Sequence, residues 1–509
     1  MITDWIDVGE VSAERDPNLH NYFYDAGVSK ELVDNSKQYL LLGRKGAGKT
    51  AVFIHLLRKP EKIFKDSDIV IGMSLQSYRW KAHNLLGDLQ KVGGFQHKDS
   101  WRFAIYVEAL HAAKEHFEKN NKKAPKQVQQ AWQCLEKIFS QPMPSWTALL
   151  GEKLFGLSTL RLPEVSISEE LSGSCGEVSF EKMNEDLNLR KVLNQNILNL
   201  TDWLENSLKH LPDENRIFLV FDRLDEAWIE GFIDQSKAIV SGLLHAAEHS
   251  LNIFKGKIRP LVFLREDIFS ALSINDRNKL RHDCSESLRW TQDEIEKLVL
   301  TRINFYARQA NQSEISSLQE IFQEKDMRSR TPPVKHLFNR TMCRPRDMVA
   351  FLGLTFKAAK DDGHHNSDGT KISTKAIYSA EPVYSEYLYE ELSDEWRNQN
   401  TDFHEYLRTF ENLRYAAIST EELESDFKAK ALTKDRSDFR AAARFLFENS
   451  IIGVTVGASN QWRYRCFWPN QAFIDTDTIK VHPGLIKRLG LTEGSSSKAA
   501  QLGADNTQE

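Results

Sequence analysis

Short apolar runs alternate with helical stretches through the first 290 residues of the chain. Four of these runs have the length of buried strands, namely Gln38–Leu42, Asp68–Leu75, Ile217–Phe221 and Ile258–Leu264. Strands that alternate with helices predict a parallel sheet whose connecting helices cross its faces. We therefore expect an α/β core over residues 1–290.

The second and third apolar runs are separated by an unusually long segment, at about residues 76–216. A plain crossover between parallel strands needs far less chain, so we expect an inserted subdomain here. The segment contains an amphipathic helical pattern over Trp101–Phe117 and a basic connector, KNNKKAPK, at residues 119–126. Its pattern does not indicate a role.

The rest of the chain divides into a helical region and a mixed one. Residues 291–360 read as a helical lid that begins with a capping box, Thr291 with Glu294. A polar linker follows at Lys360–Thr370. Residues 371–491 predict a helical, winged-helix-like domain, with a helix at Phe439–Gly453 and then the alternating segment QWRYRCFW. Residues 492–509 lack apolar anchors and are predicted to form a disordered tail.

Composition narrows the class of protein. Lys and Arg number 67 against 72 for Asp and Glu, which excludes a wholly basic nucleic-acid coat. No apolar run approaches the 18 residues of a membrane helix, and no secretory signal is visible, so we expect no membrane partner. The five cysteines are scattered and form no CxxC, which predicts reduced thiols in a cytoplasmic protein.

A phosphate-binding loop follows the first apolar run. Residues 43–50 fit G-x-x-x-x-G-K-[ST] at every fixed position, and a strand precedes and a helix follows them. The residues are Gly43, Arg44, Lys45, Gly46, Ala47, Gly48, Lys49 and Thr50. The glycines let backbone N–H groups face the phosphates of ATP, Lys49 should reach the β- and γ-phosphates, and the Thr50 hydroxyl should bind Mg²⁺.

The third apolar run ends in acidic residues, IFLVFDRLDE. Asp222 is placed at the carboxyl end of a strand, where it should hold the Mg²⁺ through water. Glu226 and Asp225 are the candidates that orient or deprotonate the attacking water; the pattern does not choose between them and leaves open that neither does so.

Several basic residues are candidate sensors of the nucleotide. Arg265 follows the fourth strand, and we expect it either to contact the γ-phosphate or the attacking water, or to form an ion pair with Glu266 or Asp267. Arg346 begins a helix in the lid region, from which it either reaches the phosphates or belongs to a basic surface. Arg277, Lys279 and Arg281 are weaker candidates for a charge supplied to a neighbouring subunit.

Taken in order, a series of segments resembles bacterial P-loop ATPases on the STAND, KAP and Cdc6/Orc-like side of the AAA+ group. The segments are GRKGAGKTAVF, DRLDEAW, FLREDIF, INDRNK, RWTQDEIEKLVLTRI and RPRDMVAFL. The resemblance implies an ASCE/AAA+-like core, ATP and Mg²⁺ as ligands, a homo-oligomer and a hydrolysis-driven switch. It also implies a protein effector partner, since such proteins are found in antiphage defence loci. Arg223 after Asp222 and the large insertion depart from the family pattern.

Three functions remain open on this basis. The first is an ATPase switch that controls an effector, and the second is a nucleic-acid-binding AAA+ ATPase of the loader or repair type. The second is favoured by the basic run Lys325–Arg346 and by the arginines of QWRYRCFW, which are suited to DNA or RNA phosphates. The third is a scaffold that binds ATP and turns over little of it.

Overall fold

The computed structural model describes residues 1–76, 78, 80–88, 91, 93–139, 142–143, 145, 160–163, 175–178, 187–228, 231–396, 400–456 and 461–496. These residues form two compact units, each with its own apolar core. The α/β unit is Asp25–Arg289, and the helix-rich unit is Met1–Tyr24 together with Trp290–Glu509. The N-terminal 24 residues therefore differ from the predicted arrangement, because they pack with the C-terminal half of the chain.

The α/β unit contains a five-stranded sheet in the order β2-β5-β6-β1-β7, and every neighbouring pair in it is parallel. Its strands are β1 (Leu40–Gly43), β2 (Ile69–Ser74), β5 (Ile217–Asp222), β6 (Ile258–Arg265) and β7 (Ser285–Ser287). The four predicted strands are thus confirmed, and β7 is an additional one. Strand β6 lies between β1 and β5, which is the arrangement of an ASCE/AAA+-like P-loop core, so the predicted fold class is confirmed.

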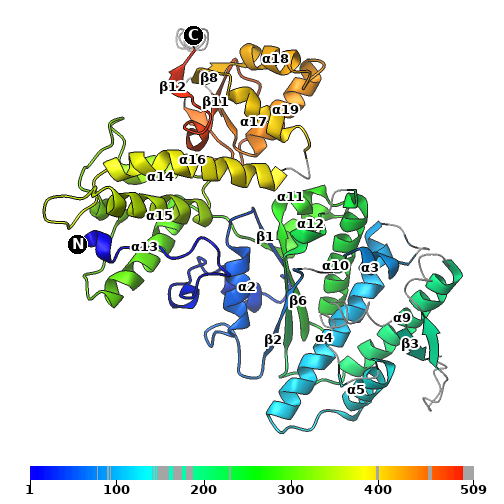
Figure 1. Ribbon diagram of the computed structural model, residues 1–509. Coiled ribbons are helices and arrows are strands. Elements are labelled where there is room, and N and C mark those ends of the chain that lie inside the picture. The colour runs from blue at the N-terminus through cyan, green and yellow to red at the C-terminus, as the bar shows by residue number, and fades with distance from the viewer. Residues whose placement is uncertain are drawn as a thin grey trace. The chain divides into compact units, whose positions relative to one another are not determined.

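Helices cover both faces of this sheet (Figure 1). The sheet unit has the helices α1 (Val28–Asp34), α2 (Lys49–Leu57), α3 (Trp80–Leu85), α4 (Lys98–Lys119), α5 (Lys126–Phe139), α9 (Leu187–Leu208), α10 (Ile233–Ile253), α11 (Glu266–Ala271) and α12 (Arg277–Asp283), with short 3₁₀ turns η3 (Gly93–His97) and η5 (Leu224–Ala227). Helix α2 packs so closely on β2 that a Cβ on Gly72 would lie 2.7 Å from Leu57 Cδ1. On the other face, the Trp101 ring of α4 meets Phe221 edge-on.

The inserted segment is part of the same core. Trp101 Nε1 donates to the Ile239 carbonyl of α10 at 2.9 Å, and a buried network of Arg102, Tyr106 and Glu205 joins α4 to α9. The helix predicted at Trp101–Phe117 is confirmed as part of α4. Its predicted amphipathic character is wrong for residues 100–110, which are all buried because α9, α10 and the sheet surround them. A hairpin of β3 (Leu160–Pro163) and β4 (Cys175–Val178) completes the described part of the insertion.

The helix-rich unit joins a helical bundle to a small β module. It has the helices α13 (Gln292–Gln309), α14 (Pro333–Arg340), α15 (Pro345–Asp361), α16 (Lys375–Trp396), α17 (Phe403–Phe410), α18 (Thr420–Ala429) and α19 (Arg436–Glu448), and the 3₁₀ turns η1 (Ile2–Asp4), η2 (Leu19–Asn21), η6 (Leu318–Ile321) and η8 (Pro483–Leu485). The capping box of Thr291 and Glu294 is present at the start of α13. Helices α15 and α16 pack through stacked rings of Phe351 and Tyr384, so α16 belongs to the bundle that precedes the predicted linker.

The β module has strands β8 (Tyr415–Ser419), β9 (Ile452–Thr455), β10 (Trp462–Arg463), β11 (Thr478–Val481) and β12 (Thr492–Ser495), in the order β10-β9-β11-β8-β12. Helices α18 and α19 lie between β8 and β9 in sequence, and β11 pairs antiparallel with both strands. This is the connectivity of a winged-helix-like module, as predicted.

Two local predictions in this module are wrong. The helix predicted at Phe439–Gly453 ends at Glu448, because Ser450 has a φ of 62° and β9 begins at Ile452. Residues Thr492–Ser495, predicted to begin a disordered tail, form β12 beside β8. This strand is held by backbone hydrogen bonds such as that of the Thr492 amide with the Arg414 carbonyl, which need no apolar side chain. The rest of the predicted tail, from residue 497, lies outside the described residues.

Candidate nucleotide-binding site

The predicted phosphate loop connects β1 to α2. Gly46 and Gly48 have φ values of 79° and 100°, a region that side chains with a Cβ rarely adopt. Gly43 is required for a different reason, since a Cβ there would lie 3.3 Å from both Ala47 Cβ and Leu288 Cβ. The three glycines therefore form a tight loop at the N-terminus of α2, where the helix dipole favours an anion.

Lys49 lies over this loop. Its Nζ donates to the carbonyl oxygens of Gly43 and Arg44, at 3.0 and 3.1 Å. Burial lowers the pKa of Lys49, while the carboxylates of Asp225 and Asp222 oppose that shift, in that order. The amino group thus lies against the loop carbonyls, and its pKa is affected by one acid of β5 and one acid of η5.

Asp222 ends β5 and is 3% exposed. Its carboxylate accepts hydrogen bonds from the Thr50 hydroxyl and the Arg223 amide, and burial raises its pKa. Among the described residues, its Oδ2 is a buried oxygen with no hydrogen-bond partner. A buried carboxylate oxygen without a donor is costly unless a cation binds it, so Thr50 and Asp222 are residues that would hold a Mg²⁺ ion.

The acids that follow Asp222 lie in η5, and the chain enters that turn through Arg223, whose φ is 64°. Asp225 Oδ2 lies 3.8 Å from Arg265 Nη1, and the charge of Asp225 is the largest of the acidic charges that oppose the lowering of the Lys49 pKa. Glu226 Oε1 instead lies 3.5 Å from Arg223 Nη1. The two candidates for the catalytic base therefore have different neighbours.

Arg265 ends β6 beside Gly43, its register partner on β1. The Nε and Nη2 atoms of its guanidinium donate hydrogen bonds to Asp267, at 3.1 and 2.8 Å. The third nitrogen, Nη1, lies on the side of Asp225. The predicted ion pair with Asp267 is thus present, and it holds Arg265 next to an acid of η5. A contact of Arg265 with phosphate stays a prediction.

Comparisons with known proteins find similarity to one family model over part of the chain. The FunZ-associated C-terminal helical domain matches residues 293–393, which cover α13 to α16 and cross the predicted linker. A curated relative, the putative transposon gamma-delta 80.3 kDa protein of Escherichia coli (strain K12), is 24% identical over 408 residues, or 78% of this chain and 52% of that protein. The chain thus spans about half the length of this relative.

Two solved structures align over nearly the whole chain with low similarity. Cdc6p from Pyrobaculum aerophilum is 12% identical, with a TM-score of 0.31 over 96% of this chain and 98% of that one. The Drosophila ORC bound to DNA is 9% identical, with a TM-score of 0.31 over 95% of this chain and 88% of that one.

Arg346 lies in the helix-rich unit, in the first turn of α15. Its Nη1 lies 3.0 Å from Glu391 Oε2 of α16. Two other members of the basic run Lys325–Arg346 are buried with acids: Arg344 with Glu395 at 3.0 Å, and Arg340 with Glu381 and Glu493. These three arginines hold α14, α15 and α16 together, so much of the charge of this run is neutralised within the unit.

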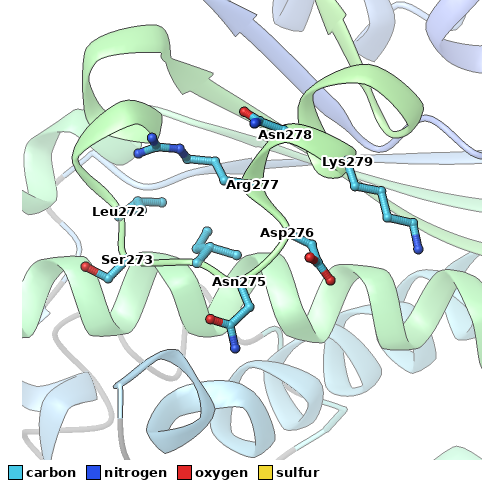
Figure 2. A pocket seen from close by; sticks show the side chains of 8 residues that line it. Leu272, Ser273, Asn275, Asp276, Arg277, Asn278 and Lys279 are labelled. Carbon is cyan, nitrogen blue, oxygen red and sulfur yellow. The ribbon is translucent and has the colours of Figure 1, made fainter.

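The weaker basic candidates lie around the connection between α11 and α12. Residues Leu272–Lys279 line a pocket of about 590 Å³ there, and Figure 2 shows Arg277 and Lys279 pointing in different directions from it. Arg277 donates to the Ser270 carbonyl, and Arg281 lies 3.6 Å from Glu266. Their role toward a neighbouring subunit stays a prediction.

Sequence reasoning missed the neighbours that shape the loop. Leu288, directly after β7, packs on Gly43 and Gly48, and its amide donates to the Leu42 carbonyl at 2.7 Å. The only signal for β7 was the short segment SES, which has no apolar pattern. The described residues contain no group of three His, Cys, Asp or Glu side chains that would hold a metal by itself. None of the described helices is long and apolar enough to cross a lipid bilayer.

Proposed function

We propose that the chain is a Mg²⁺-dependent ATPase that acts as a molecular switch. The observation that carries this proposal is the pairing of Thr50 with Asp222, whose buried Oδ2 has no donor among the described residues, beside Lys49 and the glycine loop. Mg²⁺ bound there would neutralise phosphate charge and orient the γ-phosphate. Gly43 to Thr50 would hold the phosphates, with Lys49 released from the loop carbonyls to contact them.

Within this proposal, Asp225 is the residue that orients the attacking water and takes its proton. Asp225 is supported by its proximity to Lys49, Asp222 and Arg265, whereas Glu226 is near Arg223. Arg265 would act as the positioning residue for Asp225 and for the γ-phosphate, held in place by Asp267.

The proposal also includes partners, namely further copies of this chain and a protein effector. We expect ATP to promote assembly of a homo-oligomer and control of a protein effector, and an antiviral role in the cytoplasm, all on the resemblance to STAND, KAP and Cdc6/Orc-like ATPases. Mass photometry with and without ATP tests the assembly. A phage-plaque assay of cells that carry the gene and its neighbours tests the antiviral role.

The enzymatic proposal is tested by phosphate release from Mg·ATP. Lys49→Ala removes the charge that contacts the phosphates, and we expect hydrolysis to fall by at least about 100-fold. Lys45→Ala, in the same loop, is the matched control and should retain most of the rate. Equal rates in the wild type and Lys49→Ala would disprove the ATPase function, and tight ATP binding without turnover in the wild type would favour the scaffold.

The second candidate is an ATPase that acts on nucleic acid. It is favoured by the winged-helix-like module, in which Arg440 and Arg444 lie four residues apart on exposed positions of α19. The similarity to a transposon protein also points in this direction. Gel shifts over a salt series test it, because phosphate contacts weaken as salt rises.

A further inference from the structure

Two basic segments that are far apart in the sequence surround one end of the α/β unit. Residues 58–66 (RKPEKIFKD) lie between α2 and β2, and residues 118–127 (EKNNKKAPKQ) run from the last residues of α4 to the first residues of α5. Together they contain eight Lys and Arg residues against three acids, Glu61, Asp66 and Glu118. Seven of the eight basic residues are exposed, and Lys59 is half-buried. We call these two segments the lysine patch.

The fold brings the two segments together through Asn215, which lies just before β5. Its side-chain amide is 3.3 Å from the Ser67 carbonyl, next to the first segment, and 3.3 Å from His116 Nε2, near the end of α4. The pKa of His116 is lowered by its partial burial and then by the charges of Lys122, Lys59 and Lys119. Lysines of both segments therefore act on the same imidazole.

Both segments have a defined backbone. In the second, the Lys122 amide donates to the Phe117 carbonyl at 2.9 Å, and Asn120 Nδ2 donates to the His116 carbonyl at 2.8 Å, which ends α4. In the first, the Phe64 ring is buried against Phe218 of β5, at 5.1 Å between ring centroids. The lysines thus project from anchored connections, so little conformational entropy is lost at the backbone when a ligand binds.

The lysine patch lies away from the phosphate loop. The first segment leads into the start of β2, at the amino edge of the parallel sheet, whereas Gly43 and Asp222 end their strands at the carboxyl edge. Figure 1 shows the ends of α2 and α4 at this amino edge. The lysines are therefore not needed to bind the nucleotide, and the proposed ATPase does not account for them.

We propose that the lysine patch binds the phosphate backbone of a nucleic acid. Lysines are point charges that suit phosphates without reading bases, and the exposed side-chain amides of Asn121 and Gln127 add hydrogen-bond donors for phosphate oxygens. An acidic protein surface is less well matched, because protein interfaces are centred on large apolar or aromatic side chains. The exposed residues of the second segment are Glu, Lys, Asn and Gln.

The test uses the full chain and a triple substitution, Lys119→Glu, Lys122→Glu and Lys123→Glu. Fluorescence anisotropy measures binding to a labelled 30-base-pair DNA duplex and to a 30-nucleotide RNA of the same sequence over a salt series. The matched control, Lys297→Glu, Lys357→Glu and Lys375→Glu, changes the net charge equally on exposed positions of the helix-rich unit.

We expect the patch variant to bind at least about 10-fold more weakly and its salt slope to fall by about 2 to 3, against less than about 3-fold for the control. The ratio of DNA to RNA affinity identifies the natural ligand class. Equal losses in both variants, or no loss in either, would overturn the proposal. So would competition by polyglutamate at the same charge concentration, which would mark the site as one for acidic protein.

Lys49→Ala separates this proposal from the ATPase proposal. It should abolish hydrolysis and leave the affinity for the duplex unchanged, while the patch triple should keep the basal ATPase rate measured without nucleic acid. Loss of duplex binding in Lys49→Ala without unfolding would contradict an independent site at the lysine patch.

Discussion

At the scale of single residues, the burial of the Asp222 carboxylate affects both the stability of the protein and its affinity for a cation. Its carboxylate is buried at the end of β5, and burial raises its pKa above the ordinary value of 3.8. The Thr50 hydroxyl and the Arg223 amide donate to it, and Oδ2 is left without a donor among the described residues. Such a group destabilises the nucleotide-free protein and binds a cation well.

Asp222→Asn should therefore stabilise the nucleotide-free protein while it weakens Mg·ATP binding. The folded state keeps the proton of Asp222 to a higher pH than the unfolded state, so stability falls as pH rises from about 4 through the raised pKa. Thermal unfolding should show a higher Tm for the variant at pH 7, by about 2 °C or more, and a smaller difference at pH 4.5. A Tm that falls at pH 7 would show that the Oδ2 atom of the charged carboxylate has a partner in the nucleotide-free protein.

Single substitutions also decide which of the two acids of η5 is the catalytic base. Asp225→Asn should lower kcat by about 10²- to 10⁴-fold with little change in ATP affinity, because it removes the base near Lys49. Glu226→Gln is the matched control and should stay within about 5-fold, since Glu226 faces Arg223. Steady-state hydrolysis and ATP titration of both variants decide the assignment, and the reverse pattern would give the role to Glu226.

At the scale of elements, Arg259 determines how α1 meets the sheet. It lies in β6 with 1% of its surface exposed, and its guanidinium donates to the carbonyls of Leu32, Val33, Asn35 and Gln38. These are the last carbonyls of α1 and of the loop into β1, which have no helical partners of their own. Burial and the charge of Arg216 lower the pKa of Arg259 to about 10, so Arg259 stays charged at neutral pH and binds this set of carbonyl dipoles.

Arg259→Met should destabilise the α/β unit by about 2 kcal/mol or more, because it leaves buried carbonyls without donors. The urea midpoint should fall, and Mg·ATP affinity should fall with it, since β1 carries the phosphate loop. Arg58→Met, an exposed arginine, should change the midpoint little. An unchanged midpoint for Arg259→Met would mean that water replaces the guanidinium at these carbonyls.

At the scale of the whole molecule, residues 1–24 belong to the helix-rich unit. The remainder of that unit begins only at Trp290, after the whole α/β unit has intervened in the sequence. Arg302 of α13 donates to the Val8 carbonyl at 2.8 Å, lies 3.3 Å from Asp16 Oδ2, and covers the Tyr22 ring at 4.8 Å. Tyr22 in turn donates to Asp16. The chain therefore begins and continues in one unit, with the P-loop core as an inserted unit.

Deletion of residues 1–24 should consequently loosen α13 and leave the sheet intact. The deletion exposes the buried guanidinium of Arg302 and removes the apolar contacts of Ile2, Ile6 and Val8. Amide hydrogen exchange should speed up in α13 by at least about 10-fold while β1 and β5 keep their protection. Faster exchange confined to β1 and β5 would instead place the segment with the α/β unit in solution.

Much of the candidate site followed from the sequence because its parts are local. The phosphate loop, the strand before it and the helix after it are set by spacing over about a dozen residues, and Asp222 by its place after an apolar run. The ion pairs of Arg340 and Arg344 could not be predicted from the sequence, because their acidic partners Glu381 and Glu395 lie 41 and 51 residues away. Strand β7 was also missed, since the polar segment SES carries no apolar pattern.

The amino-acid sequence by itself determined the P-loop, the parallel α/β core and the winged-helix-like order, because glycine spacing and apolar periodicity act between near neighbours. Only the tertiary structure decided that Asp225 lies 3.8 Å from Arg265, that residues 1–24 pack on α13, and that two lysine-rich connections meet beside Asn215. Those relations depend on side chains brought together by the packing of distant segments, and no local pattern records such packing.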